Sequence, residues 1–129
     1  CINYKQNSKW SKEILSFTKG QGVDHVIEVG GPETLGESIN SVKVGGHISV
    51  IGILSGLQGN LDFVNALLKQ VTLQGILVGS RTHQERMIAY INQTKLFPII
   101  DRVFDLEDIV SAFQYQETNQ HFGKICIKI

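Results

Sequence analysis

The sequence is poor in cysteine, and its two cysteines, Cys1 and Cys126, stand at opposite ends of 129 residues. No pair has CxxC spacing, so the cysteines indicate neither a metal cluster nor a disulfide framework, and the cytoplasm is the expected compartment. There is also no surplus of charge, because twelve Lys and Arg balance twelve Asp and Glu. We therefore expect neither nucleic acid nor anionic lipid as a partner.

Long apolar runs are missing as well. No stretch approaches the ~20 apolar residues that a membrane-spanning helix needs, so no membrane partner is expected. The opening residues, "CINYKQNSKW", lack the apolar centre of a signal peptide. They begin without Met and with a short β-like segment that has no lead-in, so we expect the chain to be part of a longer protein.

Apolar runs bounded by glycine predict three strands, at residues 23–29, 47–54 and 71–79. Their apolar residues are continuous rather than alternating, which is typical of parallel strands covered on both faces. Helical spacing predicts helices at residues 7–19, 32–42 and 61–70, with Asp62 as an N-cap of the last. This alternation predicts an α/β fold, a partial Rossmann-like, doubly wound parallel sheet over residues 1–80.

The remaining residues, 81–129, have a different pattern and predict a helical and extended segment that packs elsewhere. Thr82 and Glu85 have capping-box spacing before a helix. Residues 97–106 are irregular and then extended, and residues 107–120 predict another helix. The closing "KICIKI" alternates, which predicts a strand with one exposed face.

The three predicted strands share glycine at their carboxyl ends, in "EVGG", "VIGI" and "LVGS". In an open α/β sheet ligands bind at these ends, and glycine allows close approach to the backbone. Any one of these glycines could simply end a strand, but three in succession favour a nucleotide crevice. The pair Gly30–Gly31 before a predicted helix also resembles a phosphate-binding turn.

The dinucleotide fingerprint GxGxxG is absent, because the nearest segment, "GGPETLG", has the wrong spacing. No P-loop occurs either. If a dinucleotide binds, we expect its pyrophosphate turn to lie outside this chain.

The segment "GVDHVIEVGGPETLGESINSVKVGGHISVIGILSG", followed by "LVGSR" and "HFGKICIKI", resembles the C-terminal half of medium-chain dehydrogenases/reductases. The alcohol-dehydrogenase-like and NADPH:quinone-oxidoreductase-like branches are most similar, and the resemblance covers essentially the whole chain. It implies that residues 1–80 belong to the dinucleotide-binding domain and residues 81–129 to the substrate domain. "INY" resembles the end of the family's third cofactor-domain strand, and the three glycine-ended strands resemble the fourth, fifth and sixth.

The resemblance implies cofactor contacts at these three strand ends. The first lies beside the nicotinamide ribose, the second meets the carboxamide, and the third adjoins the ring and the substrate cleft. In chain order they are Val29, Gly30 and Gly31; Ile51, Gly52 and Ile53; and Leu77, Val78 and Gly79. Lys124 falls where many members place a cation that reaches the pyrophosphate, or it is a solvated lysine on an edge strand. Arg81 is a weaker candidate for the same role.

No catalytic or metal-binding residue is expected within this chain. The resemblance implies that the glycine-rich turn, the residue that selects NAD or NADP, any zinc ligands and the proton relay all lie upstream. Its four histidines stand far apart, although His121 could line a cleft. Glu28 is expected to make structural hydrogen bonds, and Cys126 to act as a small hydrophobic residue.

The resemblance therefore implies a parent enzyme that transfers hydride between NAD(P)(H), with NADP preferred, and an alcohol, carbonyl or quinone. The isolated chain is expected to be inactive. One alternative is an association module that forms a homodimer through the strand from Val71 to Gly79, as in dimeric relatives. A non-catalytic nucleotide-binding or structural relative is another.

Overall fold

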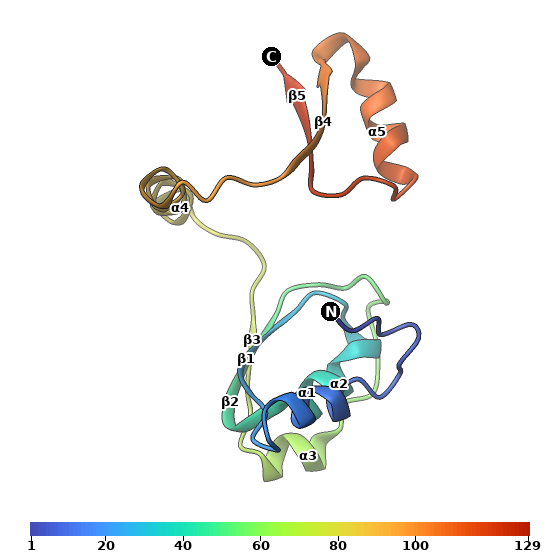
Figure 1. Cartoon of the computed structure of the whole chain (residues 1–129), viewed down its shortest axis with the longest axis vertical. Coiled ribbons are helices and arrows are strands. Elements are labelled where there is room, and N and C mark those ends of the chain that lie inside the picture. The colour runs from blue at the N-terminus through green and yellow to red at the C-terminus, as the bar shows by residue number, and fades with distance from the viewer. The chain divides into compact units, whose positions relative to one another are not determined.

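The computed structural model describes all residues, 1–129, and the chain forms two compact units, Cys1–Val78 and Gly79–Ile129 (Figure 1). Each unit contains parallel strands joined through helices. The predicted α/β class with parallel sheets is thereby confirmed. No helix is long and apolar enough to cross a bilayer.

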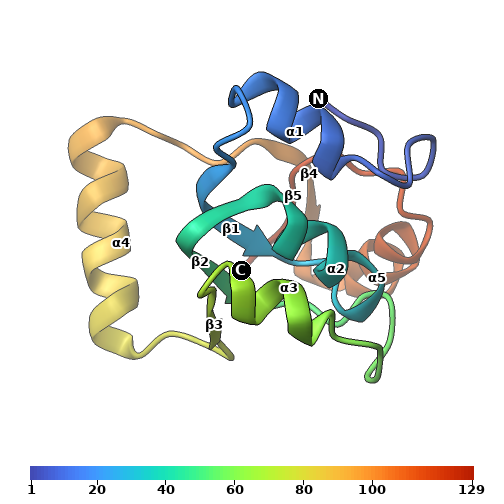
Figure 2. The same cartoon turned by 90° about the horizontal axis from the view of Figure 1, so that it is seen from below.

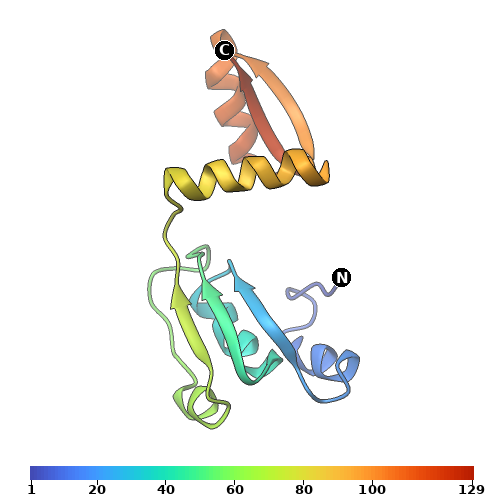
Figure 3. The ribbon, with the colours of Figure 1, turned by 90° about the vertical axis from the view of Figure 1, so that its left-hand side faces the viewer.

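The first unit contains a three-stranded sheet with the order β1-β2-β3, and all of its strands are parallel (Figure 3). The chain reaches β1 through α1, and α2 and α3 make the two crossovers of the sheet. The elements are α1 (Ser11–Phe17), β1 (Val23–Glu28), α2 (Pro32–Ser41), β2 (Val42–Val50), α3 (Phe63–Leu68) and β3 (Thr72–Gly75). Asp62 caps α3 as predicted, by accepting a hydrogen bond from the Asn65 amide.

The core of this unit lies between the sheet and the helices α2 and α3 (Figure 2). Ile39 of α2 packs with Val42 and Ile48 of β2, and all three are fully buried. The opposite face is open, since Ile27 of β1 is 61% exposed and every residue of β3 is exposed. The expectation that these strands are covered on both faces is therefore wrong within this unit.

The strands also end earlier than the apolar runs that predicted them. Regular pairing of β2 with β1 covers His47 to Val50, and then the backbone amides of Ile51 and Gly52 turn to the Glu28 carbonyl. β3 pairs with β2 only as far as Gly75. Leaving the ladder frees the residues after each strand to form the turns described below.

The second unit contains α4 (Arg81–Thr94), β4 (Ile100–Asp105), a short 3₁₀ turn (Leu106–Asp108), α5 (Ile109–Glu117) and β5 (Lys124–Lys128). β4 and β5 pair in parallel, with α5 in the crossover (Figure 3). Pairing shifts by one residue between Ile100 and Arg102, so β4 carries a bulge at Asp101. The Asp101 carboxylate accepts hydrogen bonds from the Tyr115 hydroxyl (2.8 Å) and the Phe122 amide (3.1 Å), which ties β4 to α5 and to the loop before β5.

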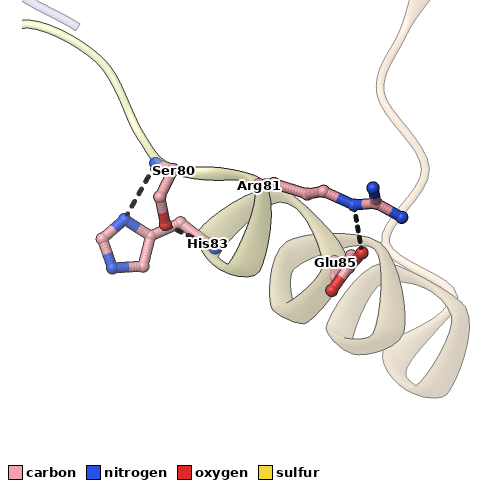
Figure 4. A network of polar contacts seen from close by, with 4 residues as sticks. All are labelled: Ser80, Arg81, His83 and Glu85. Carbon is pink, nitrogen blue, oxygen red and sulfur yellow. Dashed lines mark hydrogen bonds and ion pairs between the residues drawn. The ribbon is translucent and has the colours of Figure 1, made fainter.

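The start of α4 differs from the predicted capping box of Thr82 and Glu85. The hydroxyl of Ser80 accepts from the His83 amide, and the His83 ring accepts from the Ser80 amide (Figure 4). Glu85 instead pairs with Arg81, its neighbour one turn earlier, at 2.8 Å. The prediction was wrong because histidine can complete a capping box through a ring nitrogen, which the usual Glu/Gln signature does not include.

Candidate functional site

The carboxyl ends of β1 and β2 are joined by main-chain hydrogen bonds. The Glu28 carbonyl accepts from the amides of Ile51 (2.9 Å) and Gly52 (3.1 Å), and the Gly30 carbonyl accepts from the amide of Ser55 (2.8 Å). The structure therefore brings the predicted residues Val29, Gly30 and Gly31 together with Ile51, Gly52 and Ile53. Two of the three predicted strand ends form one continuous backbone surface.

Glycine is required on this surface because the two chain segments touch. A Cβ atom on Gly52 would lie 1.6 Å from the Val29 carbonyl oxygen and 2.6 Å from its Cα. Gly31 has φ +103°, a conformation that side-chain-bearing residues rarely adopt, and a Cβ there would lie 3.1 Å from the Gly52 carbonyl oxygen. These two glycines fix the separation of the two turns.

Glu28, the last residue of β1, is buried beneath the turn at Val29 to Gly31 and is only 3% exposed. Its Oε1 accepts from the amides of Gly30 (2.8 Å) and Gly31 (3.0 Å) and from the Thr34 hydroxyl (2.6 Å). Its Oε2 accepts a short hydrogen bond from the Ser38 hydroxyl. The structural role expected for Glu28 is therefore the organisation of this turn and of the first turns of α2.

These contacts determine the ionisation of Glu28. Burial alone would raise the pKa of its carboxyl, but the hydroxyls of Ser38 and Thr34 and the amides of Gly31 and Gly30 together hold the pKa below the ordinary value of 4.5. The carboxylate is thus the form that the fold stabilises at neutral pH.

The contribution of Glu28 to stability is expected to fall in acid. Because its folded-state pKa is depressed, the stabilisation is complete above the ordinary pKa and is lost as the pH falls through the folded pKa. The free-energy difference between the wild type and Glu28→Gln should be largest at pH 7 and shrink below about pH 4.5. Urea unfolding followed by Trp10, the only tryptophan and a residue of the first unit, measures it. An equal difference at pH 7 and pH 4 would contradict this prediction.

Two grooves flank the turn at Val29 to Gly31. The larger, of about 640 Å³, is lined by Val29 and Gly30 together with apolar residues that include Trp10 and Ile14. The smaller, of about 230 Å³, lies between Gly31 and the second turn at Gly52 and Ile53. The larger volume is in the range of small-molecule sites.

The third predicted strand end is less enclosed. The amide of Ile76 still donates to the Val50 carbonyl (2.9 Å), but Leu77 and Val78 are 91% and 81% exposed. Gly79 begins the second unit, and a Cβ atom on it would lie 3.3 Å from the Cβ of His83 in α4.

Lys124, the predicted pyrophosphate contact, also belongs to the second unit. It opens β5, where its amide donates to the Ile99 carbonyl (2.8 Å), and its side chain is exposed. Gly123, the residue before Lys124, has φ +109°, and a Cβ atom there would lie 2.5 Å from the Ile99 carbonyl oxygen. Arg81, the weaker candidate, donates from Nε to the Glu85 carboxylate (2.8 Å), and its side chain is exposed.

A comparison with protein families matches residues 1–127 to the model of the zinc-binding dehydrogenase family. The chain belongs to the zinc-binding dehydrogenase family. The resemblance to medium-chain dehydrogenases/reductases is thereby confirmed.

Curated relatives support the same assignment. A zinc-type alcohol dehydrogenase-like protein of Schizosaccharomyces pombe is 37% identical over 132 residues, 99% of this chain and 38% of that protein. Quinone oxidoreductase-like protein 2 of Bos taurus is 26% identical over 138 residues, 99% of this chain and 39% of that protein. The chain thus spans about two fifths of the length of these relatives.

Solved structures are similar over the same extent. A proposed alcohol dehydrogenase from Sinorhizobium meliloti 1021 has a TM-score of 0.88 and 31% identity, with 99% of this chain and 37% of that chain covered. An NAD-dependent alcohol dehydrogenase has a TM-score of 0.83 and 26% identity, with 96% and 36% covered.

The name of the zinc-binding dehydrogenase family implies a zinc ion, but the residues of this chain do not fit one. No three His, Cys, Asp or Glu side chains lie close enough together to hold a metal ion. His25 shares a hydrogen bond with the Ser49 hydroxyl (2.8 Å), and its ring lies 4.6 Å from the tilted ring of His47, centroid to centroid. The Nδ1 atom of His121 is buried without a hydrogen-bond partner.

Thr34 and Ser38 are the site residues that the sequence analysis missed. Both are on α2, one turn apart, and both donate to Glu28. A carboxylate at the end of a strand, followed on the next helix by hydroxyl residues at helical spacing, is the signal that could have found them.

Proposed function

We propose that this chain forms the nicotinamide side of the cofactor site in an NAD(P)-dependent oxidoreductase that acts on an alcohol, a carbonyl compound or a quinone. The observation that carries the proposal is the backbone surface that joins Val29–Gly31 to Ile51–Ile53 at the carboxyl ends of parallel strands. Family membership and relatives named as alcohol dehydrogenase-like and quinone oxidoreductase-like support it.

The cofactor, when bound, supplies the hydride chemistry. In our proposal the chain's own residues position it: Val29, Gly30 and Gly31 lie along the nicotinamide ribose, and the backbone of Ile51, Gly52 and Ile53 meets the carboxamide. Leu77, Val78 and Gly79 adjoin the ring and the substrate. The contact between the two segments at Gly31 and Gly52 supports this proposal, because it holds the two strand ends side by side at a fixed separation.

We further propose that Lys124 reaches the pyrophosphate as a point charge and that NADP is preferred over NAD. Residues 1–80 would then belong to the dinucleotide-binding domain and residues 81–129 to the substrate domain. The protein would work in the cytoplasm. The chain alone would be inactive, because its sequence has no GxGxxG turn for the pyrophosphate and no group of three His, Cys, Asp or Glu side chains that could hold a metal ion.

A titration of the ¹⁵N-labelled chain with reduced nicotinamide riboside tests the site. We expect amide shifts at Gly30, Gly31 and Gly52, and none of comparable size with adenosine, the matched control from the other half of the cofactor. Equal responses to both ligands, or shifts confined to other residues, would refute the assignment. With NADPH and a quinone or aldehyde, no turnover by the chain alone is expected, and measurable turnover would refute its inactivity.

The same chain could also act through association, a second candidate that the open edge of the sheet favours. β3 is one of the two edge strands of the sheet, and all of its residues are exposed. We propose that the strand from Val71 to Gly79 pairs with its copy across a two-fold axis to form a homodimer. Sedimentation velocity at rising concentration decides this, since a strict monomer would exclude it.

A further inference from the structure

The turn between β1 and α2 has the parts of a phosphate-binding site. It follows a parallel strand, it precedes a helix of ten residues, and it places the amides of Gly30 and Gly31 near the helix N-terminus. Gly31, the N-cap residue, has no side chain that could cap the helix. Phosphate groups commonly bind in such a position.

In this protein the same amides are already occupied. Both donate to a single oxygen of Glu28, which also accepts from Thr34. No Lys, Arg or His forms an ion pair with the Glu28 carboxylate. The negative charge is therefore held by the turn and by hydroxyls of α2, as a bound phosphate would be.

A phosphate that entered this turn would meet two obstacles. It would have to displace Glu28 from two backbone amides, and it would approach a buried negative charge of the same sign. A neutral or cationic group meets neither obstacle when it lies against the outer surface of the turn.

We propose that Glu28 acts as an internal anion that occupies the phosphate position of the Gly30–Gly31 turn, and so determines that the turn accepts uncharged or cationic ligand groups and excludes phosphate. This specificity role rests on the contacts of Glu28 alone. This role does not depend on whether nicotinamide binds at the site proposed above.

Inorganic phosphate titrated into ¹⁵N-labelled chain tests the proposal. In Glu28→Ala the amides of Gly30 and Gly31 should shift with phosphate, with an affinity at least about tenfold higher than in the wild type. A folded Glu28→Ala variant without this response would overturn the proposal, and so would a wild-type chain whose Gly30 and Gly31 amides bind phosphate.

Glu33→Ala is the matched control. Glu33 lies in the first turn of α2 and carries the same charge as Glu28, but it is exposed and its carboxylate accepts no hydrogen bond from the Gly30–Gly31 turn. Its loss should leave the turn closed to phosphate, and phosphate binding at Gly30 and Gly31 in this variant would overturn the proposal.

A wild-type measurement covers the case in which Glu28→Ala does not fold. The amide protons of Gly30 and Gly31 should shift in step with the titration of the Glu28 carboxyl, observed through its ¹³Cδ signal. If the chemical shifts of the Gly30 and Gly31 amide protons did not change as the Glu28 carboxyl titrates, the proposal would be overturned.

Discussion

Gly52→Ala is expected to cost the first unit at least about 3 kcal/mol of unfolding free energy, or to prevent its folding. The new Cβ would lie 1.6 Å from the Val29 carbonyl oxygen, and backbone atoms surround that position. Relief requires the ends of β1 and β2 to separate, which would break the hydrogen bonds from Ile51 and Gly52 to the Glu28 carbonyl. Urea unfolding followed by Trp10 fluorescence measures the loss.

Gly36→Ala is the matched control for this substitution. Gly36 lies within α2, and a Cβ there would meet nothing within 4 Å. Alanine should stabilise the helix by about 0.5–1 kcal/mol, since glycine loses more backbone entropy on folding. If Gly52→Ala cost no more than about 1 kcal/mol, the close approach of the two strand ends would be wrong.

Lys69→Met is expected to destabilise the first unit by about 2 kcal/mol. The Lys69 ammonium donates to the carbonyls of Ile39 (3.0 Å), Asn40 (2.6 Å) and Val42 (2.8 Å), where α2 ends and β2 begins. Burial lowers the pKa of this ammonium, while the three carbonyls satisfy its donors. Methionine keeps the apolar stem but leaves the last carbonyls of the helix without this partner.

Lys43→Met provides the comparison, because it makes the same chemical change at a neighbouring position. Lys43 pairs only with the exposed carboxylate of Asp24, and an ion pair in solvent contributes little. We expect a much smaller loss, again by urea unfolding with Trp10 as the probe. If both variants lost the same unfolding free energy, the hydrogen bonds from Lys69 to the three carbonyls would contribute no more than the exposed ion pair of Lys43.

The sequence predicted the elements of the first unit well because local signals and packing agree there. Glycine-bounded apolar runs gave β1, β2 and β3, and the Asp62 cap marked the start of α3. The strand ends were placed too late, because the amides of Ile51 and Gly52 bond to Glu28 across the sheet. That partner lies more than twenty residues away, so no local pattern reveals it.

The candidate site was predicted only in part for a related reason. Glycine at a strand end allows close approach to the backbone, and in the structure the approach at Gly31 and Gly52 is made by the other chain segment. The spacing of "GGPETLG" argued against a phosphate at the Gly30–Gly31 turn, but it did not reveal that a side chain of the protein supplies the anion. The hydrogen bonds from Thr34 and Ser38 to Glu28 identify the Glu28 carboxylate as that anion.

The bulge at Asp101 has a consequence for changes in chain length. Because Ile100 pairs with Lys124 and Arg102 with Ile125, Asp101 is the one residue of β4 without a partner in the ladder. Its deletion would leave a regular ladder with the register of Val103 to Asp105 unchanged, yet it would remove the carboxylate that binds Tyr115 and Phe122. A homologue one residue shorter here can therefore keep the pairing of its strands while losing the anchor of the loop before β5.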